Sequence, residues 1–453
     1  MTSCLGLYVE SNVIKYAKIS KDRDNLKVES FGLKFYDKLG DAIKQIISET
    51  YSFKVPISIN LADEVYSYFY MFSMLNKKDL KKAIETEYEA YCTEKGLNKN
   101  AVETRYALVN SLSDKDRVKV IHVAANKNNL NAIEQQLAEN KIAAISPIGM
   151  TIANIAKMKQ KENIAIINME DKTTVTIIVN QKVYSVDTIE NGSGEVLDGI
   201  NAKENSYSKA YEICKNSTIY TMEGQELQDT ENEYLDNIMP TLYKIAENSK
   251  KIIENSAIDI DRIYITGTLS VVNNIDLYFQ EFFNTEKCEI LKPFFIKDSI
   301  KVNIKDYVEV NSAIAMAMQG LGYGVKDMNF KKHSITDNLP EWMTIDLGSP
   351  NANSKIGNGL KEFFSVDWKA KLDTTEKWLL RVAGGFLILV LLYTGFTIVI
   401  NNQYEQKTLE ANEVRQDTMT KLAAVNSDIN SVKAKTNQYL QLADNLRSTS
   451  EKI

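Results

Sequence analysis

Histidine and cysteine, which most often supply catalytic nucleophiles, bases and metal ligands, are scarce in this 453-residue chain. The two histidines are His122 and His333, and the four cysteines lie far apart at positions 4, 92, 214 and 288. No CxxC pair or Cys/His cluster occurs, so the sequence favours neither a zinc site nor a disulfide framework. His122 lies in a strand-like apolar run, where we expect a buried structural role. We therefore predict no catalytic residue, no metal site and four buried, reduced thiols.

Composition narrows the classes of function further. The net charge of −6 argues against nucleic-acid binding, which normally requires a basic surface. Hydrophobic residues make up 44% of the chain, enough for two or three domain-sized cores. No basic and apolar leader opens the chain, so we expect its first domain to remain in the cytoplasm.

One segment, Val382–Ile400, carries no charged residue. Its length matches the ~20 residues that cross ~30 Å of hydrocarbon, and the flanking Trp378 and Tyr404 are typical of membrane interfaces. A buried core helix is the alternative, but few soluble helices are apolar all round for so long. Basic residues before the segment outnumber those after it, which predicts a cytoplasmic N-terminal part and an extracytoplasmic tail.

The tail after this segment has the pattern of a coiled coil. Apolar residues from Leu422 to Leu446 repeat at alternating spacings of three and four, and no proline or glycine follows Asn401. A single solvated helix is the alternative. The stretch Val325–Glu376, ahead of the membrane segment, is rich in polar residues, glycine and proline, and it resembles a linker.

The elements that would position any site lie in the first 325 residues. Three strands, a helix and a strand are predicted at Cys4–Glu10, Asn12–Ile19, Leu26–Phe35, Leu39–Tyr51 and Val55–Leu61. A second set of strands is predicted at Ile164–Asn168, Thr174–Val179 and Lys182–Val186, followed by helical runs. Alternating strands and helices indicate an α/β domain, and the repeated opening indicates an internal duplication.

This doubled pattern resembles the actin-like ATPase superfamily, in particular the PilM-type proteins of type IV pilus assembly. The segments that carry the resemblance follow the family order: LGLYVESNVIK (Leu5–Lys15), AIINMEDKTTVTIIV (Ala165–Val179), KAYEICK (Lys209–Lys215), RIYITGTLS (Arg262–Ser270) and VNSAIAMAMQGLG (Val310–Gly322). The resemblance implies an actin-like fold of duplicated RNase H-like halves with an inserted subdomain at about 62–145.

The part after residue 325 resembles the start of PilN-type proteins, the usual membrane partner of PilM. We therefore predict a PilM–PilN fusion: an actin-like domain at 1–325, a flexible linker at 326–376, a transmembrane helix at 377–401 and an extracytoplasmic coiled coil at 402–453. Either Val325–Phe330 or Asp337–Trp342 is expected to stand in for the short PilN peptide that docks on PilM. The sequence leaves the choice between them open.

The resemblance also implies a nucleotide site, and the sequence departs from its pattern. The residues at the two family Asp positions are Tyr8 and Asn168, and glutamates replace the nearby glycines at Glu10 and Glu170. The carboxylates that would bind Mg²⁺ are therefore missing. Glu10 and Glu170 are expected to place negative charge beside the phosphates and, unlike glycine, to disfavour a positive φ there. The residues that could still bind nucleotide are Ser11, Asn12, Lys15, Thr173, Thr174, Glu212, Lys215, Gly267 and Thr268. We expect ATP to bind weakly or not at all, and no hydrolysis.

The expected function is an inner-membrane scaffold of type IV pilus assembly. Its predicted partners are a PilO-like coiled-coil membrane protein and a cytoplasmic motor ATPase or platform protein, and the tail is also a candidate for self-association. The alternatives are a nucleotide-regulated actin-like switch, which would require clear Mg-ATP affinity, and a cell-division membrane tether, which more often uses an amphipathic tail. A sugar kinase is a further alternative, but it would need a catalytic Asp base, and no motif in the sequence indicates one.

Overall fold

The computed structural model describes residues 2–23, 25–112, 114, 116–220, 233–296 and 304–331. The chain divides into two units, Met1–Asn338 and Leu339–Ile453. The second unit, with the predicted transmembrane helix and coiled coil, lies wholly outside the described residues, so those two elements stay predictions. Within the described part, no helix has both the length and the apolar character needed to cross a membrane.

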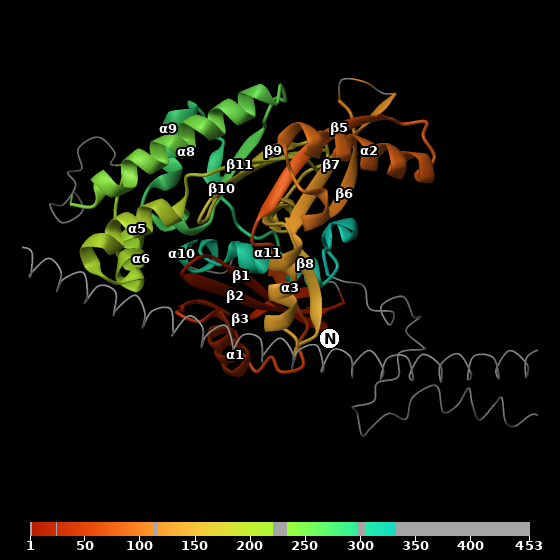
Figure 1. The fold of residues 1–453 in the computed structure, drawn as a ribbon. Helices are drawn as coiled ribbons and strands as arrows, with labels where there is room; N and C mark the ends of the chain where they lie inside the picture. The colour runs from red at the N-terminus through yellow and green to blue at the C-terminus, as the bar shows by residue number, and fades with distance from the viewer. Residues whose placement is uncertain are drawn as a thin grey trace, which may run out of the picture. The chain divides into compact units, whose positions relative to one another are not determined.

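The first sheet has five strands in the order β3-β2-β1-β4-β8. They are β1 (Thr2–Val9), β2 (Val13–Asp22), β3 (Asn25–Phe35), β4 (Ile57–Asn60) and β8 (Ile142–Ser146). The first three pair antiparallel, whereas β4 and β8 continue the sheet parallel to β1. Helix α1 (Leu39–Glu49) covers one face and α11 (Asn311–Gly320) covers the other (Figure 1). Gly6 permits close packing with α11, since a Cβ there would lie 2.0 Å from the Ala313 carbonyl oxygen.

The second sheet repeats this plan in the order β11-β10-β9-β12-β13. Its strands are β9 (Asn163–Met169), β10 (Thr173–Val179), β11 (Lys182–Ile189), β12 (Arg262–Thr266) and β13 (Cys288–Ile290). Again an antiparallel meander is followed by two parallel strands. The same order and pairing in both sheets show the internal duplication that the sequence predicts.

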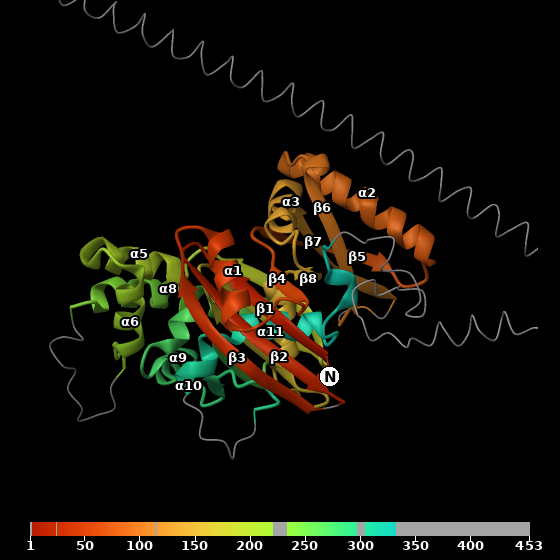
Figure 2. The same ribbon diagram turned by 90° about the horizontal axis from the view of Figure 1, so that it is seen from below.

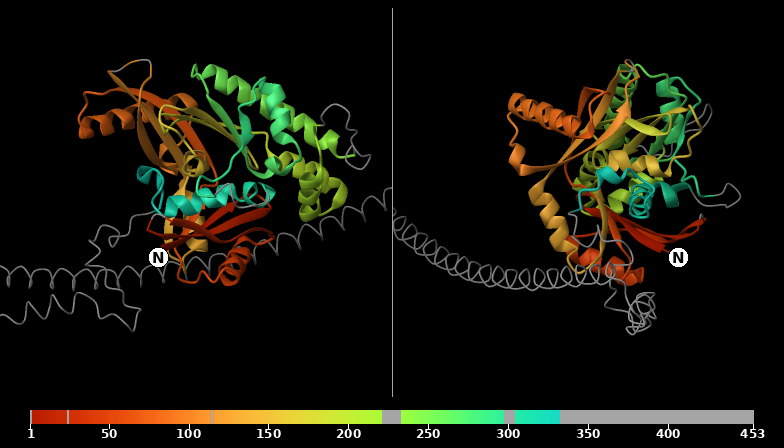
Figure 3. Two further views of the ribbon diagram at one scale, coloured as in Figure 1. Left: turned by 180° about the vertical axis from the view of Figure 1, so that it is seen from behind. Right: turned by 90° about the vertical axis from the view of Figure 1, so that its right-hand side faces the viewer.

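Helices surround the second sheet and complete the unit. They are α5 (Ser193–Glu204), α6 (Tyr207–Asn216), α8 (Leu235–Asn255), α9 (Ile275–Phe283) and α10 (Ile304–Val308). The short helical turns α4 (Ile148–Thr151) and η2 (Ile152–Ile155) lie between β8 and β9, and η3 (Thr268–Val271) links β12 to α9. The long helix α8 begins after Tyr234 and buries the stripe Ile238, Leu242, Ile245 and Ala246, as expected for an amphipathic helix on a core. Figure 3 shows α8 and α9 side by side in both of its views.

A third sheet, in the order β5-β7-β6, lies between β4 and β8 in the sequence. It consists of β5 (Glu64–Phe72), β6 (Val102–Asn110) and β7 (Arg117–Asn126), with α2 (Lys77–Lys95), η1 (Lys99–Ala101) and α3 (Lys127–Gln136). Helix α2 lies along this sheet in Figure 2 and shares a small core with it, built from Met71, Leu80, Ile84 and Val120. His122 is buried in β7 beside Tyr88, with 4.1 Å between the ring centroids.

The four cysteines are all buried and free. The described unit continues beyond residue 325, where a flexible linker was predicted to begin. The turn η4 (Lys326–Met328) and the residues after it are folded against the domain, with Met328 and Phe330 buried.

Candidate functional site

The two hairpin turns that the resemblance assigns to phosphate binding face and bind each other. The turn between β1 and β2 contains Glu10 and Ser11, and the turn between β9 and β10 contains Glu170 and Asp171. The backbone N–H and the hydroxyl of Ser11 both donate to Asp171 Oδ2, each at 2.6 Å. In return, the Asp171 N–H donates to Glu10 Oε1 at 2.9 Å. The two halves of the duplicated fold are therefore joined directly, turn to turn.

Beneath these turns, Lys15 occupies the centre of a buried ionic cluster. Its side chain is fully buried, and Nζ forms ion pairs with Glu170 and, at 3.4 Å, with Glu10 Oε2. Nζ also donates to Thr268 Oγ1 at 2.6 Å. Lys15 projects from β2 of the first half, whereas Glu170 and Thr268 come from the second half, so this cluster also bridges the two halves.

Hydrogen bonds to Glu170 complete the cluster. The Thr268 N–H donates to Glu170 Oε2 at 2.9 Å, and the Thr268 hydroxyl donates to the same oxygen at 2.8 Å. The hydroxyl of Ser312, at the start of α11, donates to the other oxygen, Oε1. Glu170 therefore has hydrogen-bond donors on both carboxylate oxygens, as a buried charge requires.

The protonation states follow from burial and charge. Burial raises the pKa of Glu10 well above its usual value, the neighbouring carboxylates Glu170 and Asp171 add to the rise, and Lys15 only partly opposes it. For Glu170 burial also favours the neutral form, but the Lys15 ammonium and the Ser312 and Thr268 hydroxyls outweigh it, so its pKa is lowered. The pKa of Lys15 is raised because the two glutamates outweigh its burial. We therefore assign an ionised Lys15–Glu170 pair beside a protonated Glu10.

The backbone adapts to the two glutamates. Neither Glu10 nor Glu170 is among the described residues with positive φ, so the bar to positive φ expected from the sequence does not arise. Gly267 has a φ of +94°, which glycine adopts readily, and a Cβ there would lie 2.7 Å from the backbone of Met169. A side chain is therefore excluded at the turn that delivers the Thr268 N–H to Glu170.

Tyr8 and Asn168, the residues at the two family Asp positions, are packed inside the domain. Tyr8 is 7% exposed, and burial together with the nearby acidic residues raises the pKa of its phenol well above the usual value. The Asn168 amide donates to Ser312 Oγ at 3.3 Å. Within the described residues, no group of three or more His, Cys, Asp and Glu side chains is arranged to hold a metal ion.

The remaining predicted residues lie in separate places. Thr173 donates its hydroxyl to the Asn191 carbonyl at 2.8 Å, whereas Thr174 is buried on β10. On α6, Glu212 is exposed and Lys215 pairs with Glu309 at 3.1 Å. Asn12, in the first turn, is half-buried. The structure thus brings together Ser11, Lys15, Gly267 and Thr268, and commits Lys215 to a carboxylate of the protein itself.

Four residues of the cluster were not predicted to bind anything. Glu10 and Glu170 were interpreted only as groups that repel phosphate, and Asp171 and Ser312 were not considered. The sequence did contain a sign of this cluster: Glu10 and Glu170 occupy the same position in two similar hairpins, and Lys15 lies on the second strand of the first hairpin.

A second constellation holds the segment after α11 against β8, the edge strand of the first sheet. The Asn329 side chain accepts from the Ile145 N–H and donates to the Ala143 carbonyl, both at 3.1 Å. The Phe330 N–H donates to the Ile145 carbonyl at 2.8 Å. Arg105 of β6 donates to the Asn329 carbonyl at 3.1 Å, and its guanidinium lies 5.3 Å from the centroid of the Phe330 ring.

This segment is one of the two docking candidates that the sequence left open. Val325–Phe330 ends in residues that lie between β6 and β8, with Met328 and Phe330 each only 1% exposed. The other candidate, Asp337–Trp342, lies outside the described residues.

Comparison with known proteins bears on the fold. No family model and no curated protein matches the chain. Among solved structures, a PilM-PilN type IV pilus biogenesis complex aligns over 70% of this chain and 98% of that chain, at 14% identity and a TM-score of 0.57. The chain has the actin-like ATPase fold.

Other solved structures align with lower scores. The ethanolamine utilization protein EutJ from Carboxydothermus hydrogenoformans covers 72% of this chain and 90% of its own, at 11% identity and a TM-score of 0.40. A Bacteroides thetaiotaomicron protein described as having an actin-like ATPase fold covers 70% and 95%, at 10% identity and a TM-score of 0.34. In this chain the actin-like fold places the ionic cluster at the junction of its two halves.

Proposed function

We propose that the chain is a membrane-anchored scaffold of a type IV pilus-like assembly machine, in which the actin-like domain binds partners and does not turn over nucleotide. The observation that carries the second half of this proposal is the buried cluster of Lys15, Glu10 and Glu170. The basic group that would contact phosphates is already neutralised by Glu170. ATP binding would have to break this pair and move both glutamate side chains, which costs several kcal/mol.

The first half of the proposal is supported by the solved PilM-PilN type IV pilus biogenesis complex, which has the same fold. The segment packed on β8 gives a physical link between the domain and the rest of the chain. In a fusion of the two proteins, such a segment would tie the domain to its own membrane part instead of to a separate partner. The membrane anchor would be Val382–Ile400, with the domain in the cytoplasm and the tail outside.

The scaffold role requires partners on both sides of the membrane. We propose a PilO-like coiled-coil membrane protein at the tail and a cytoplasmic motor ATPase or platform protein at the domain. The test is to crosslink native membranes, purify the full chain and identify what is attached to it by mass spectrometry. We expect assembly components of both kinds.

Two variants make this test specific. Val425→Asp with Ile429→Asp places charges in the predicted apolar seam and should remove the membrane partner while the cytoplasmic partner remains. Asn426→Asp with Asn430→Asp adds the same charges beside the seam and should change nothing. If the wild-type chain carries no component of a pilus or secretion machine, the proposed role is wrong.

A further inference from the structure

The loop between β5 and α2, residues 73–76, has an exposed apolar tip that the role proposed above does not explain. Met74 in this loop is 94% exposed, and Phe72 at the end of β5 is 60% exposed. Tyr70, two residues earlier on the same face of β5, is 49% exposed. Large apolar side chains that project together into solvent are typical of a binding surface.

The rest of the loop is held in place by the inserted sheet and by α2. The backbone N–H of Ser73 donates to the Asp116 carbonyl at 2.8 Å. The Leu75 side chain packs against the small core that this sheet shares with α2. Asn76 caps α2, because its side chain accepts from two backbone N–H groups of the first turn at 3.0 and 3.1 Å. These contacts fix the loop and leave Met74 directed into solvent.

A cluster of lysines follows the tip. Residues 72–82 contain four lysines and one aspartate, although the whole chain has a net charge of −6. Lys78 and Lys82 lie one helical turn apart, are exposed, and form no ion pair with any residue that the structure describes. Lys81 lies 3.9 Å from Glu85, but the two side chains are 67% and 60% exposed, so this pair holds the lysine only weakly.

The acidic residues nearby do not cancel this charge. Asp114 pairs with Arg117 at 3.3 Å, and the guanidinium of Arg117 also lies 5.3 Å from the centroid of the Phe72 ring. The glutamates of α2 lie further along the helix, at positions 85, 87, 89 and 94. Positive charge is therefore concentrated at the end of α2 that adjoins the apolar tip.

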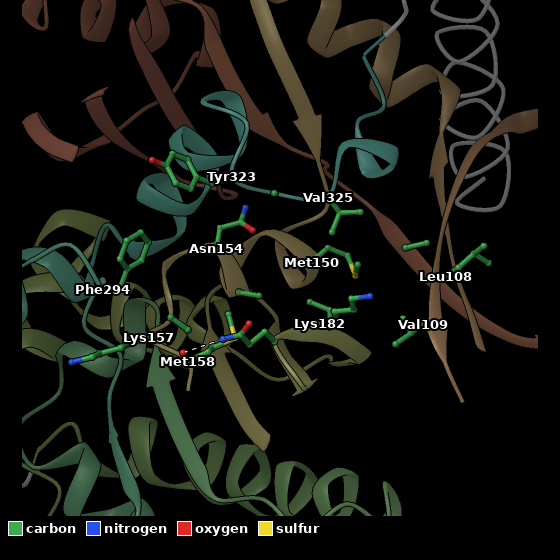
Figure 4. Close-up of a pocket in the computed structure, with 16 residues that line it drawn as sticks. Leu108, Val109, Met150, Asn154, Lys157, Met158, Lys182, Phe294, Tyr323 and Val325 are labelled. Atoms are coloured by element: carbon green, nitrogen blue, oxygen red, sulfur yellow. Dashed lines mark hydrogen bonds between the residues drawn. The ribbon is translucent and has the colours of Figure 1, made fainter. Parts of the chain in front are cut away.

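An anionic lipid surface fits this combination better than a protein partner does. Lysine has a long apolar stem, so its ammonium reaches lipid headgroups while neighbouring apolar side chains enter the headgroup–acyl boundary. A peptide partner usually binds in a groove, whereas this tip projects from a loop. The tip residues do not line the 640 Å³ pocket beside β6, where Figure 4 shows Leu108, Met150 and Tyr323. Helix α2 also lies at the periphery of the described unit in Figures 1 and 2.

We infer that this tip binds the surface of an anionic bilayer, with Phe72 and Met74 at the headgroup–acyl boundary and Lys78, Lys81 and Lys82 on the headgroups. At an anionic surface each lysine favours the bound state by roughly fivefold, so the three contribute on the order of 100-fold. The contact gives the domain a second attachment to the membrane besides the predicted anchor. The inference goes beyond the pilus role and does not depend on it.

Quenching by spin-labelled lipids in nanodiscs tests this contact in the full chain. Ser73→Cys places an environment-sensitive fluorophore at the tip, since the four native cysteines are buried. In nanodiscs of equal parts phosphatidylcholine and phosphatidylglycerol we expect emission at shorter wavelength and strong quenching by acyl-chain spin labels, and little of either in phosphatidylcholine alone. Met74→Ser should weaken the quenching without disturbing the fold, because Met74 is 94% exposed.

The charge variant combines Lys78→Glu, Lys81→Glu and Lys82→Glu and should abolish the quenching. It should still copurify with the nanodisc, which separates loss of the lipid contact from loss of the predicted anchor.

A matched control, Lys44→Glu with Lys54→Glu and Lys95→Glu, changes three exposed lysines away from the tip and should leave the quenching unchanged. A fluorophore at Ala90→Cys, on the acidic half of α2, should not be quenched. The inference is overturned by an unquenched tip in anionic nanodiscs, by equal quenching in phosphatidylcholine alone, or by a charge variant that quenches like the wild type. Shielding of the tip only after cytosolic proteins are added would also overturn it, because the partner would then be a protein.

Discussion

Replacing Lys15 by methionine is the perturbation whose cost the structure predicts most clearly. The substitution keeps the apolar stem but removes the ammonium, so Glu170 stays buried and ionised without its ion-pair partner. The carboxylate side chains of Glu10 and Glu170 are each 1% exposed, so solvent cannot replace the lost charge. Removing one partner of a buried ion pair costs about 3–5 kcal/mol, a large part of the ~5–15 kcal/mol that stabilises most domains.

Urea denaturation of the unit 1–338 measures this cost. The unit contains no tryptophan, because all three lie later in the chain, so far-UV circular dichroism is the appropriate signal. Lys251→Met provides the matched control: its ion pair with Glu247 is on the surface, with side chains 58% and 43% exposed, and should change the free energy of unfolding by less than about 1 kcal/mol.

A second variant separates the cost of leaving Glu170 as an unpaired charge from the cost of lost packing. Adding Glu170→Gln to Lys15→Met removes the stranded charge and should recover most of the lost stability, which gives a large coupling energy in a double-mutant cycle. The loss in Lys15→Met alone should also shrink at low pH, where Glu170 becomes protonated. A loss below about 1 kcal/mol, or one that Glu170→Gln does not rescue, would refute the assignment of a buried ion pair.

Three further predictions concern pH, the packed segment and topology. Because the pKa of Glu10 is raised in the folded state, the free energy of unfolding should fall as pH rises from about 4.5 to the folded pKa, by up to about 1.4 kcal/mol per pH unit. Glu10→Gln should flatten this decline, which denaturation at pH 5 and pH 8 will show. Asn329→Ala removes two side-chain hydrogen bonds to β8 and should lower the free energy of unfolding of the unit by about 1–3 kcal/mol, whereas Asn100→Ala at an exposed site should have little effect; equal losses would contradict a docked Asn329. Protease added outside right-side-out vesicles should cleave the tail beyond Asn401 and spare residues 1–377, and cleavage of the domain from that side would reverse the predicted orientation.

The fold was predictable because local patterns specify it twice. Short apolar runs separated by turns, at 1–61 and again at 163–189, indicate the two meanders, and the apolar stripe of Val310–Gly322 indicates the helix that packs on β1. The loss of the usual magnesium carboxylates at Tyr8 and Asn168 was equally visible. These inferences need only residues that are close together in sequence.

The ionic cluster could not be derived in this way. Lys15 and Glu170 are 155 positions apart in the sequence. Whether Glu170 acts as an isolated negative charge or as the partner of a lysine depends on whether these two side chains are in contact. Considered alone, Glu170 was expected to repel phosphate, whereas in the structure it forms an ion pair with Lys15. For a related reason the sequence left the choice of docking segment open: Val325–Phe330 has no periodicity, and its packing depends on the hydrogen bonds of Asn329 to β8, which only the three-dimensional structure shows.

Isothermal titration calorimetry of ATP with Mg²⁺ into the wild-type unit 1–338 tests the central claim most directly. The account predicts no binding in the micromolar range and no hydrolysis, because Lys15 is paired with Glu170 and the buried Glu10 lies beside this pair. Restoring the family pattern with Tyr8→Asp, Glu10→Gly, Asn168→Asp and Glu170→Gly frees Lys15 and should raise the affinity. Micromolar binding of Mg-ATP by the wild-type unit would contradict the account.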